Sequence, residues 1–325
     1  MKKAVEPVLH LHCPSMKLLI KSILLLLLSW PATSVWAQQT STGLKEADSL
    51  YAAGAFKESL VKCRELLKTE KPEEEIRLLM AKCWFSLNNP LELFAELDQL
   101  NRINPCYPEA LALAGLYLFK QKEYKQARKK YYLAINCSPQ TAEYHFDAGI
   151  VESKLYRWKT AIENFDRAIQ LKKNYAEAFE ARAYAHSMSK SFKLAIRDYD
   201  SALFHSPGNP DLYVKRGLNM ISLGQSREAE QLFSRAIRLD STRKSAWYSR
   251  GRVRLEMRHF NNAIADFNRV LELDAEDELA LFSKGVCLLE INKRENLEQA
   301  CDCFKKAAEK NLGQAWDFFR QYCTR

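Results

Sequence analysis

The residues of this sequence best suited to chemistry are its cysteines and histidines, and their spacing argues against an active site. Cys301 and Cys303 are close enough to share a metal, but neither a histidine nor a C-x-x-C partner accompanies them. The histidines after residue 37 are scattered along the chain, at His145, His186, His205 and His259. The phosphate-binding GxxxxGK, the nucleophile motif GxSxG and the zinc motif HExxH are missing from the sequence. We therefore expect no catalytic residue, no metal and no cofactor.

A fixed step of 34 residues organises the chain instead. Small and aromatic residues recur at this step and stay in register with one another. The small residues are Ala127, Ala161, Ala195, Ala229 and Ala263, with a second series at Gly115, Gly149, Ala183, Gly217, Gly251 and Gly285. The aromatic residues are Tyr131, Phe165, Tyr199, Phe233 and Phe267. This period is typical of an array of small units, whose function lies on an extended surface rather than in one pocket.

Residues 176–209 show what one unit contains. Phe179, Ala183 and His186 share one helical face, and a second apolar stripe follows a bend near Ser189. Pro207 stops this second stripe, because proline lacks the amide donor and disfavours a helical predecessor. We expect two antiparallel helices of about 12–14 residues each.

The small residues allow the two helices to approach closely. We expect Gly217 to face Ala229 and Gly251 to face Ala263, with Phe267 filling the space beside the contact.

The recurring small, aromatic and helix-stopping positions resemble those of the tetratricopeptide repeat family. One unit carries them at Gly251, Phe260, Ala263 and Phe267, and another at Gly115, Tyr124, Ala127, Tyr131, Ala134 and Pro139. The resemblance implies an all-α fold, a right-handed α-solenoid of about eight 34-residue helix–turn–helix repeats. It covers nearly all of the chain after residue 40, and it is specific for fold but not for function.

The repeat register divides the chain into segments. A degenerate first repeat covers residues 38–73, and six repeats follow at 74–107, 108–141, 142–175, 176–209, 210–243 and 244–277. Residues 278–325 form an atypical last repeat with a capping helix, because Ala300 comes three residues late. We expect the insertion near residues 293–296, a left-handed Gly313 that ends a helix, and a closing helix over residues 314–322. This ending resembles the Sel1-like variant of the repeat.

The first 37 residues have the pattern of a secretory signal. A short basic start at residues 16–21 precedes a leucine-rich core at residues 23–30, and Pro31 ends this core. We expect cleavage after Ala37, and an uncleaved anchor is the alternative. Residues 1–15 are unusual for a signal, so Met16 is a candidate for the true start. The sequence therefore predicts an exported protein, periplasmic or secreted.

Export would carry the cysteines into an oxidising compartment, where disulfides form. Cys106 and Cys137 lie at the same end of one predicted hairpin, and Cys301 and Cys323 flank Gly313 at similar distances. We expect a disulfide in each of these pairs. Two further pairs are open on similar grounds: Cys63 with Cys83, and Cys287 with Cys303.

The chain is basic, with a formal net charge of +9, of which residues 1–37 supply four lysines and one glutamate. The excess fits either solvated outer helix faces or an anionic partner such as a membrane surface. Nucleic acid is a disfavoured partner for an exported protein. Membrane contact is expected only through the signal or by peripheral association.

Arginines recur at the 34-residue step at Arg182, Arg216 and Arg250. Asp198 and Asp266 follow two of them by sixteen residues, which places them on the facing helix. We expect the ion pairs Arg182–Asp198 and Arg250–Asp266 to fix the register of the helices.

In the family that this sequence resembles, the inner helices line a concave groove that holds a partner peptide. Mapping those positions here gives mostly apolar and aromatic residues, which suit a protein segment. The expected binding residues are Phe146, Ile150, Tyr184, Leu218, Tyr248, Arg252 and Phe282. The family's clamp for a terminal carboxylate uses lysine and asparagine at positions that here hold Phe146, Ile150, Glu180 and Tyr184, so that specificity is not expected.

The sequence thus predicts a non-catalytic scaffold or adaptor that binds protein or peptide partners. The alternative is a structural subunit, or a self-assembling homo-oligomer, of a cell-envelope complex. An unrecognised enzyme is disfavoured because the repeats occupy the chain.

Overall fold

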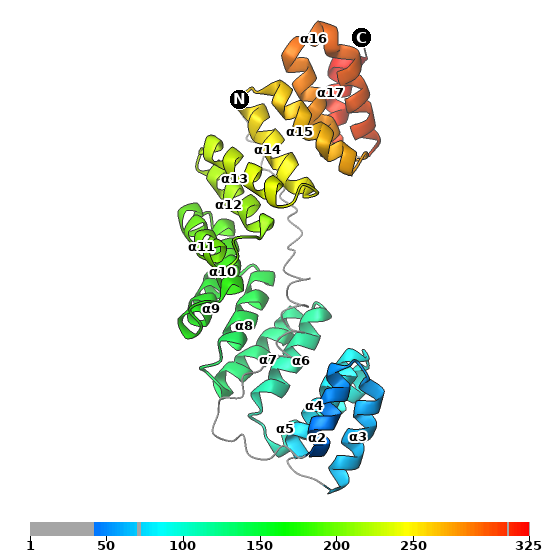
Figure 1. The fold of residues 1–325 in the computed structure, drawn as a ribbon, viewed down its shortest axis with the longest axis vertical. Coiled ribbons are helices and arrows are strands. Elements are labelled where there is room, and N and C mark those ends of the chain that lie inside the picture. Colours follow the sequence, from blue (N-terminus) through cyan, green and yellow to red (C-terminus); the bar gives the residue numbers. More distant parts are fainter. Residues whose placement is uncertain (1–41, 70–72, 311, 325) are drawn as a thin grey trace. The chain divides into compact units, whose positions relative to one another are not determined.

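The computed structural model describes residues 42–69, 73–310 and 312–324, and its regular elements there are α-helices (Figure 1). The chain divides between Tyr117 and Leu118 into two compact units. The predicted signal, with Met16 and the cleavage position after Ala37, lies outside the described residues.

The N-terminal unit is built from hairpins of helices around two apolar clusters. Its helices are α2 (Thr42–Ala52), α3 (Phe56–Thr69), α4 (Glu73–Ser86), α5 (Pro90–Ile103) and most of α6 (Pro108–Lys120). Asn89 caps α5 by accepting the Glu92 backbone N–H, and Pro90 occupies the first helical position, where its missing donor costs nothing.

The C-terminal unit continues the same pattern over a longer stretch. Its helices are α7 (Tyr124–Cys137), α8 (Ala142–Lys154), α9 (Trp158–Leu171), α10 (Ala176–Met188), α11 (Phe192–His205), α12 (Pro210–Ser222), α13 (Ser226–Leu239), α14 (Lys244–Glu256), α15 (Phe260–Leu273), α16 (Glu278–Glu309) and α17 (Gly313–Cys323). The predicted helix pairs of 13 and 14 residues are present at the expected places.

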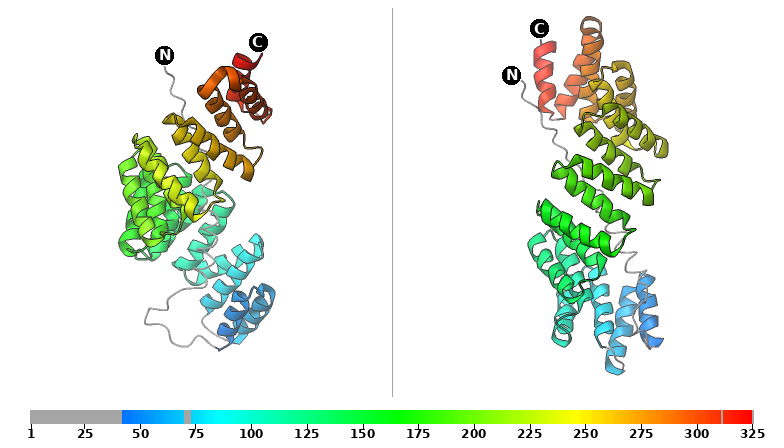
Figure 2. Two further views of the ribbon diagram at one scale, coloured as in Figure 1. Left: turned by 45° about the horizontal axis from the view of Figure 1, so that its top comes forward. Right: turned by 90° about the vertical axis from the view of Figure 1, so that its left-hand side faces the viewer.

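Helices that are neighbours in sequence pack together in this unit: α8 on α9, α9 on α10, and so on to α17 (Figure 2). The first helices of successive pairs also contact one another, as α8 does α10, α12 does α14 and α14 does α16. The pairs are therefore stacked in one orientation, which is the arrangement of an α-solenoid.

Four hairpins of the C-terminal unit close around an aromatic ring that lies against a glycine. A Cβ atom at these glycines would come within 2.5–2.8 Å of ring carbon Cε1 of the facing phenylalanine. The pairs are Gly149 with Phe165, Gly217 with Phe233, Gly251 with Phe267 and Gly285 with Phe304. The aromatic ring that the sequence places beside the close contact thus lies directly against each of these glycines. The ring, sixteen residues later in three of the pairs and nineteen in the last, leaves no room for a side chain at these glycines.

The last repeat departs from the sequence expectation at Gly313, whereas its internal break lies beside the expected insertion at residues 293–296. The break inside α16 falls at Asn292, whose φ of −156° leaves the helix, and its side chain accepts the backbone N–H groups of Arg294 and Glu295. Gly313 does not end a helix in a left-handed conformation, because α16 ends at Glu309 and Gly313 begins α17. The Asn292 side chain thus caps the second half of α16, at the place where the inserted residues lengthen the connection.

The turn inside the seven hairpins before the last has one recurrent geometry. One residue adopts a positive φ, and the next backbone N–H bonds to the carbonyl five residues earlier, as Ser191 does to His186 at 2.8 Å. This is the Schellman ending of a helix, which favours glycine. The positive-φ residues are Gly54, Asn88, Lys122, Tyr156, Lys190, Gly224 and Arg258.

We expect Lys190→Gly to raise the free energy of unfolding by about 0.5–1 kcal/mol, because a side chain is disfavoured at a left-handed φ. Lys190 has a φ of 60° and is exposed, so no packing is lost. Urea denaturation measures the change. The reverse substitution Gly224→Lys, at an equivalent turn, should lower stability by a similar amount. A loss of stability in Lys190→Gly would contradict this account of the turn.

Candidate functional site

The first helices of the stacked pairs form one layer of the C-terminal unit, which we call the inner layer: α8, α10, α12, α14 and the first part of α16. The structure brings all seven predicted binding residues onto these helices. They are Phe146, Ile150, Tyr184, Leu218, Tyr248, Arg252 and Phe282.

Three of the seven are aromatic residues that pack into the hairpins. Phe146 is only 9% exposed, and its ring centroid lies 5.0 Å from that of Tyr175. Tyr248 and Phe282 each contact a buried phenylalanine of the facing helix, at centroid distances of 5.9 and 5.7 Å. Burial raises the pKa of Tyr248, while the hydrogen bond of its hydroxyl with Ser283 lowers it. These side chains support the layer more than they present a surface.

The other four are partly exposed and recur once per repeat: Ile150, Tyr184, Leu218 and Arg252. The Tyr184 ring lies edge-on to Trp158, with centroids 6.0 Å apart. Arg252 Nη2 lies 3.8 Å from the Glu256 carboxylate. This row recurs at one position of successive inner helices and is the part of the prediction that we take as the candidate surface.

Polar contacts between neighbouring inner helices were missed by the sequence analysis. Lys215 Nζ donates to Glu180 Oε1 at 2.5 Å, and the Ser187 hydroxyl donates to Asn219 Oδ1 at 2.8 Å. Both bonds join α10 to α12. Their separations of 35 and 32 residues, close to the repeat length, are the signal that could have revealed them.

The first inner helix, α8, carries the acidic residue Asp147. This residue occupies the repeat position that Lys215 holds two repeats later. Burial, and after it the nearby Glu143 carboxylate, raises the pKa of Asp147 to about 8. At neutral pH this carboxyl group is mainly protonated, so α8 adds little charge to the layer there.

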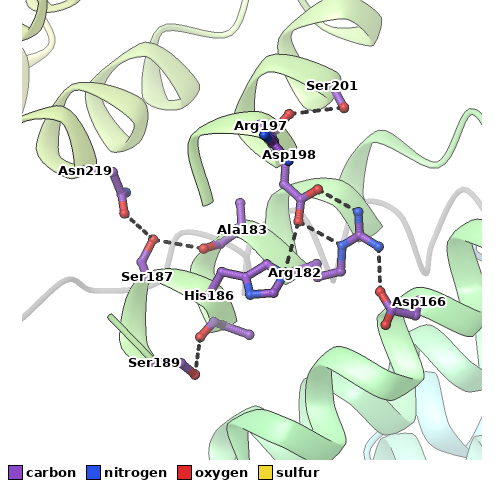
Figure 3. A network of polar contacts seen from close by, with 11 residues as sticks. Asp166, Arg182, Ala183, His186, Ser187, Ser189, Arg197, Asp198, Ser201 and Asn219 are labelled. Atoms are coloured by element: carbon purple, nitrogen blue, oxygen red, sulfur yellow. Dashed lines mark hydrogen bonds and ion pairs between the residues drawn. The ribbon is translucent and has the colours of Figure 1, made fainter. Parts of the chain in front are cut away.

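Arg182 binds two aspartates from two different helices (Figure 3). Its Nε and Nη2 atoms donate to both oxygens of Asp198 on α11, at 2.8 and 2.6 Å. Its Nη1 atom donates to Asp166 on α9 at 2.5 Å. The predicted pair Arg182–Asp198 is confirmed, and the contact with Asp166 links it to the preceding repeat.

His186 lies beside this network, with Nε2 3.8 Å from Asp198 Oδ2. Burial lowers the pKa of His186; the Asp198 carboxylate raises it and Arg182 lowers it further. The imidazole is therefore neutral at pH 7, and the carboxylate is already held by an arginine. This arrangement stabilises a hairpin through the Arg182–Asp198 pair.

The second predicted pair, Arg250–Asp266, is also confirmed and is more buried. Asp266 is 1% exposed and accepts from Arg250 Nε and Nη2 at 3.0 and 2.7 Å. Arg254 Nη1 donates to the same carboxylate at 2.9 Å, and its Nε donates to Glu230 on α13. Arg216, at the intermediate repeat, instead pairs with Asp200.

The cysteines fall into two groups. Cys301 and Cys323 are joined by a disulfide that connects α16 to α17, and Cys106 and Cys137 are each disulfide-bonded. The other two predicted pairs, Cys63 with Cys83 and Cys287 with Cys303, do not form disulfides, because all four cysteines are free thiols. Cys63, Cys83, Cys287 and Cys303 are buried, and burial raises the pKa of each thiol.

Among the described residues, no group of three or more histidines, cysteines or acidic residues is placed to hold a metal. In the same part of the chain, every helix is too short or too polar to cross a membrane. A hollow on α16 lies outside the predicted site, and it is lined by Lys284, Leu288, Glu298, Gln299, Asp302 and Cys303.

The repeat geometry defines a class of protein that comparison with known families supports. The family model described as tetratricopeptide repeat matches residues 248–315. The C-terminal part of a TPR repeat-containing protein from Cytophaga hutchinsonii is 15% identical, with a TM-score of 0.62 over 74% of this chain and 98% of that one. Residues 248–315 thus match the tetratricopeptide repeat, and the helix pairs of the C-terminal unit have the fold of such repeats.

Similar curated proteins match over part of their length. Serine/threonine-protein phosphatase 5 of Rattus norvegicus is 30% identical over 97 residues, which are 30% of this chain and 19% of the phosphatase. Hsp70-Hsp90 organizing protein 1 of Glycine max is 25% identical over 126 residues, or 39% of this chain and 22% of that protein. The chain thus covers about a fifth of the length of these relatives. The Sel1-like character of the last repeat stays a prediction.

Proposed function

We propose that this chain is an exported, non-catalytic scaffold that binds a protein or peptide segment along its inner layer. The observation that carries the proposal is the partly exposed row Ile150, Tyr184, Leu218 and Arg252, which repeats at one position of successive inner helices. An aromatic, two aliphatic side chains and an arginine are the residue types that anchor protein interfaces. Some of the relatives carry the name Hsp70-Hsp90 organizing protein, which agrees with a scaffold role.

The charges on this layer indicate what kind of segment fits. Glu180 and Lys215 neutralise each other, with side chains only 19% and 14% exposed. Asp147 is mainly protonated at neutral pH, as its raised pKa requires. A segment with apolar side chains and at most one acidic group facing Arg252 therefore suits the row better than a chain terminus held by its carboxylate.

Pull-down of partners from the cell envelope tests this function. We expect Tyr184→Ala with Arg252→Ala to reduce recovery of the bound partner at least about tenfold, since such anchors contribute about 1–2 kcal/mol each. Tyr248 is a poor choice for this purpose, because its ring packs on Phe267. Glu163→Ala with Gln170→Ala, two exposed residues of α9, is the matched control.

Three results would count against the proposal. Equal recovery with both double variants would exclude the row as the binding surface. Concentration-dependent sedimentation that the Tyr184 and Arg252 substitutions abolish would favour the alternative, a self-assembling subunit. Full-length protein found only in the cytoplasm would refute the export that residues 16–37 predict.

A further inference from the structure

The turns inside the hairpins of the C-terminal unit gather positive charge along one edge. Because the pairs are stacked in one orientation, these turns lie at the same end of successive hairpins. We call the segments around them the basic edge: residues 120–125, 154–159, 188–193, 222–227 and 256–261. They hold ten lysines and arginines against two glutamates. The turns at the other end, residues 137–142, 171–176, 205–210, 239–244 and 273–278, hold four basic and five acidic residues.

Many of these cations are not used by the fold. Arginines that stabilise hairpins, such as Arg182 and Arg250, are paired with carboxylates at 2.6–3.0 Å. By contrast, six cations of the basic edge are exposed and have no acidic partner within 4 Å in the described part of the chain. They are Lys122, Lys125, Lys159, Lys190, Lys193 and Arg227.

Their positions are locally unfavourable for a cation or for any side chain. Lys122 and Lys190 adopt φ values of 63° and 60°, where glycine is favoured. Lys125, Lys159 and Lys193 are second residues of α7, α9 and α11, where the positive end of the helix dipole repels a cation. Arg227 repeats this placement in α13. Residues that oppose the local rule at the same place in successive repeats indicate a role outside folding.

Apolar side chains lie exposed among these cations. Tyr156 is 77% exposed at the turn of α8 and α9, Met188 is 45% exposed, and Leu223 is 36% exposed. The hollow on α16, lined by Lys284, Leu288 and Cys303 among others, lies away from these turns. Cations mixed with an exposed tyrosine and aliphatic side chains, presented by turns rather than by a groove, suit the headgroup region of a membrane.

We propose that the basic edge docks the protein on an anionic phospholipid surface, separately from partner binding on the inner layer. The turns would place their cations among the lipid phosphates, while Tyr156 and Leu223 would enter the interface beside them. The inner layer would then remain free for a protein segment.

Vesicle sedimentation tests this proposal with protein purified from its own cells. Wild type should bind phosphatidylglycerol–phosphatidylcholine vesicles, should not bind pure phosphatidylcholine, and should be released by high salt. The variant Lys125→Glu, Lys159→Glu, Lys193→Glu and Arg227→Glu should bind at least about 100-fold more weakly, since each surface cation contributes about a fivefold factor. Its melting temperature should equal or exceed that of wild type, because glutamate suits a helix N-terminus.

A control variant of equal net charge distinguishes an effect of the basic edge from an effect of the protein's total charge. It carries Lys129→Glu, Lys173→Glu, Arg197→Glu and Arg235→Glu, all exposed and outside the basic edge. It should bind vesicles nearly as well as wild type. Equal loss in both variants would overturn the proposal, as would a wild type that ignores anionic vesicles. Binding to polyglutamate without binding to vesicles would also overturn it and would assign the edge to an acidic polypeptide.

Discussion

Replacing Asp266 by alanine is expected to lower the free energy of unfolding by about 3–5 kcal/mol. Asp266 is 1% exposed and is the shared acceptor of Arg250 and Arg254. Its removal leaves two guanidinium groups, with side chains only 13% and 17% exposed, near each other without this carboxylate. The penalty for an uncompensated, partly buried charge exceeds the value of the pair itself. Urea denaturation of wild type and variant measures the loss.

The control for this substitution is Asp302→Ala. Asp302 pairs with Lys306 at 2.7 Å, but both side chains are 57% exposed. An exposed pair of this kind contributes about 0–1 kcal/mol, so the variant should be nearly as stable as wild type. If Asp266→Ala were no more harmful than Asp302→Ala, the arginine–aspartate pairs would not fix the hairpins, and our interpretation of them would fail.

The effect on stability of replacing the glycine at the eighth position of a repeat is expected to depend on the facing ring. In wild type, Gly217→Ala should lower stability by about 1–3 kcal/mol by overpacking, because the new Cβ would lie 2.6 Å from Phe233 Cε1. Phe233→Ala alone should cost about 3–5 kcal/mol, since the ring is fully buried. In the Phe233→Ala background, Gly217→Ala should instead raise the free energy of unfolding by about 1 kcal/mol, because alanine favours a helix.

A double-mutant cycle of these variants, followed by chemical denaturation, isolates the contact. The repeat of residues 176–209 provides a natural comparison, because there Ala183 and Tyr199 occupy the same two positions and both are buried. This repeat shows that a hairpin can adjust to one methyl group. An identical effect of Gly217→Ala in both backgrounds would show that the ring is not the reason for the glycine.

Much of the fold could be predicted because one physical requirement recurs every 34 residues. The alanine and aromatic series set the helix register, and the sixteen-residue offset of Arg182 and Asp198 was enough to place an ion pair. The period does not show which atoms make the closest contact or where the last helix begins. The Phe233 ring lies directly against Gly217, and Gly313 begins a helix because the chain has already left α16.

The sequence was enough to predict which helices carry the candidate site residues, but not which of their side chains are exposed. The period places Phe146 and Tyr184 on the same layer, yet only the structure shows that Phe146 packs on Tyr175 while Tyr184 stays accessible. The Glu180–Lys215 bond joins different repeats, so single-repeat reasoning could not find it. The left-handed φ of Lys190 was hidden because lysine gives no sequence signal for that conformation.

The most direct test of the scaffold proposal is to locate a bound partner by site-specific photocrosslinking. A photoreactive amino acid placed at Ile150 or Tyr184 lies on the inner layer, whereas one at Glu163 lies on the exposed face of α9. The account predicts that one protein partner crosslinks from the inner positions and not from Glu163. Crosslinks to that partner from Glu163, with none from Ile150 or Tyr184, would contradict it.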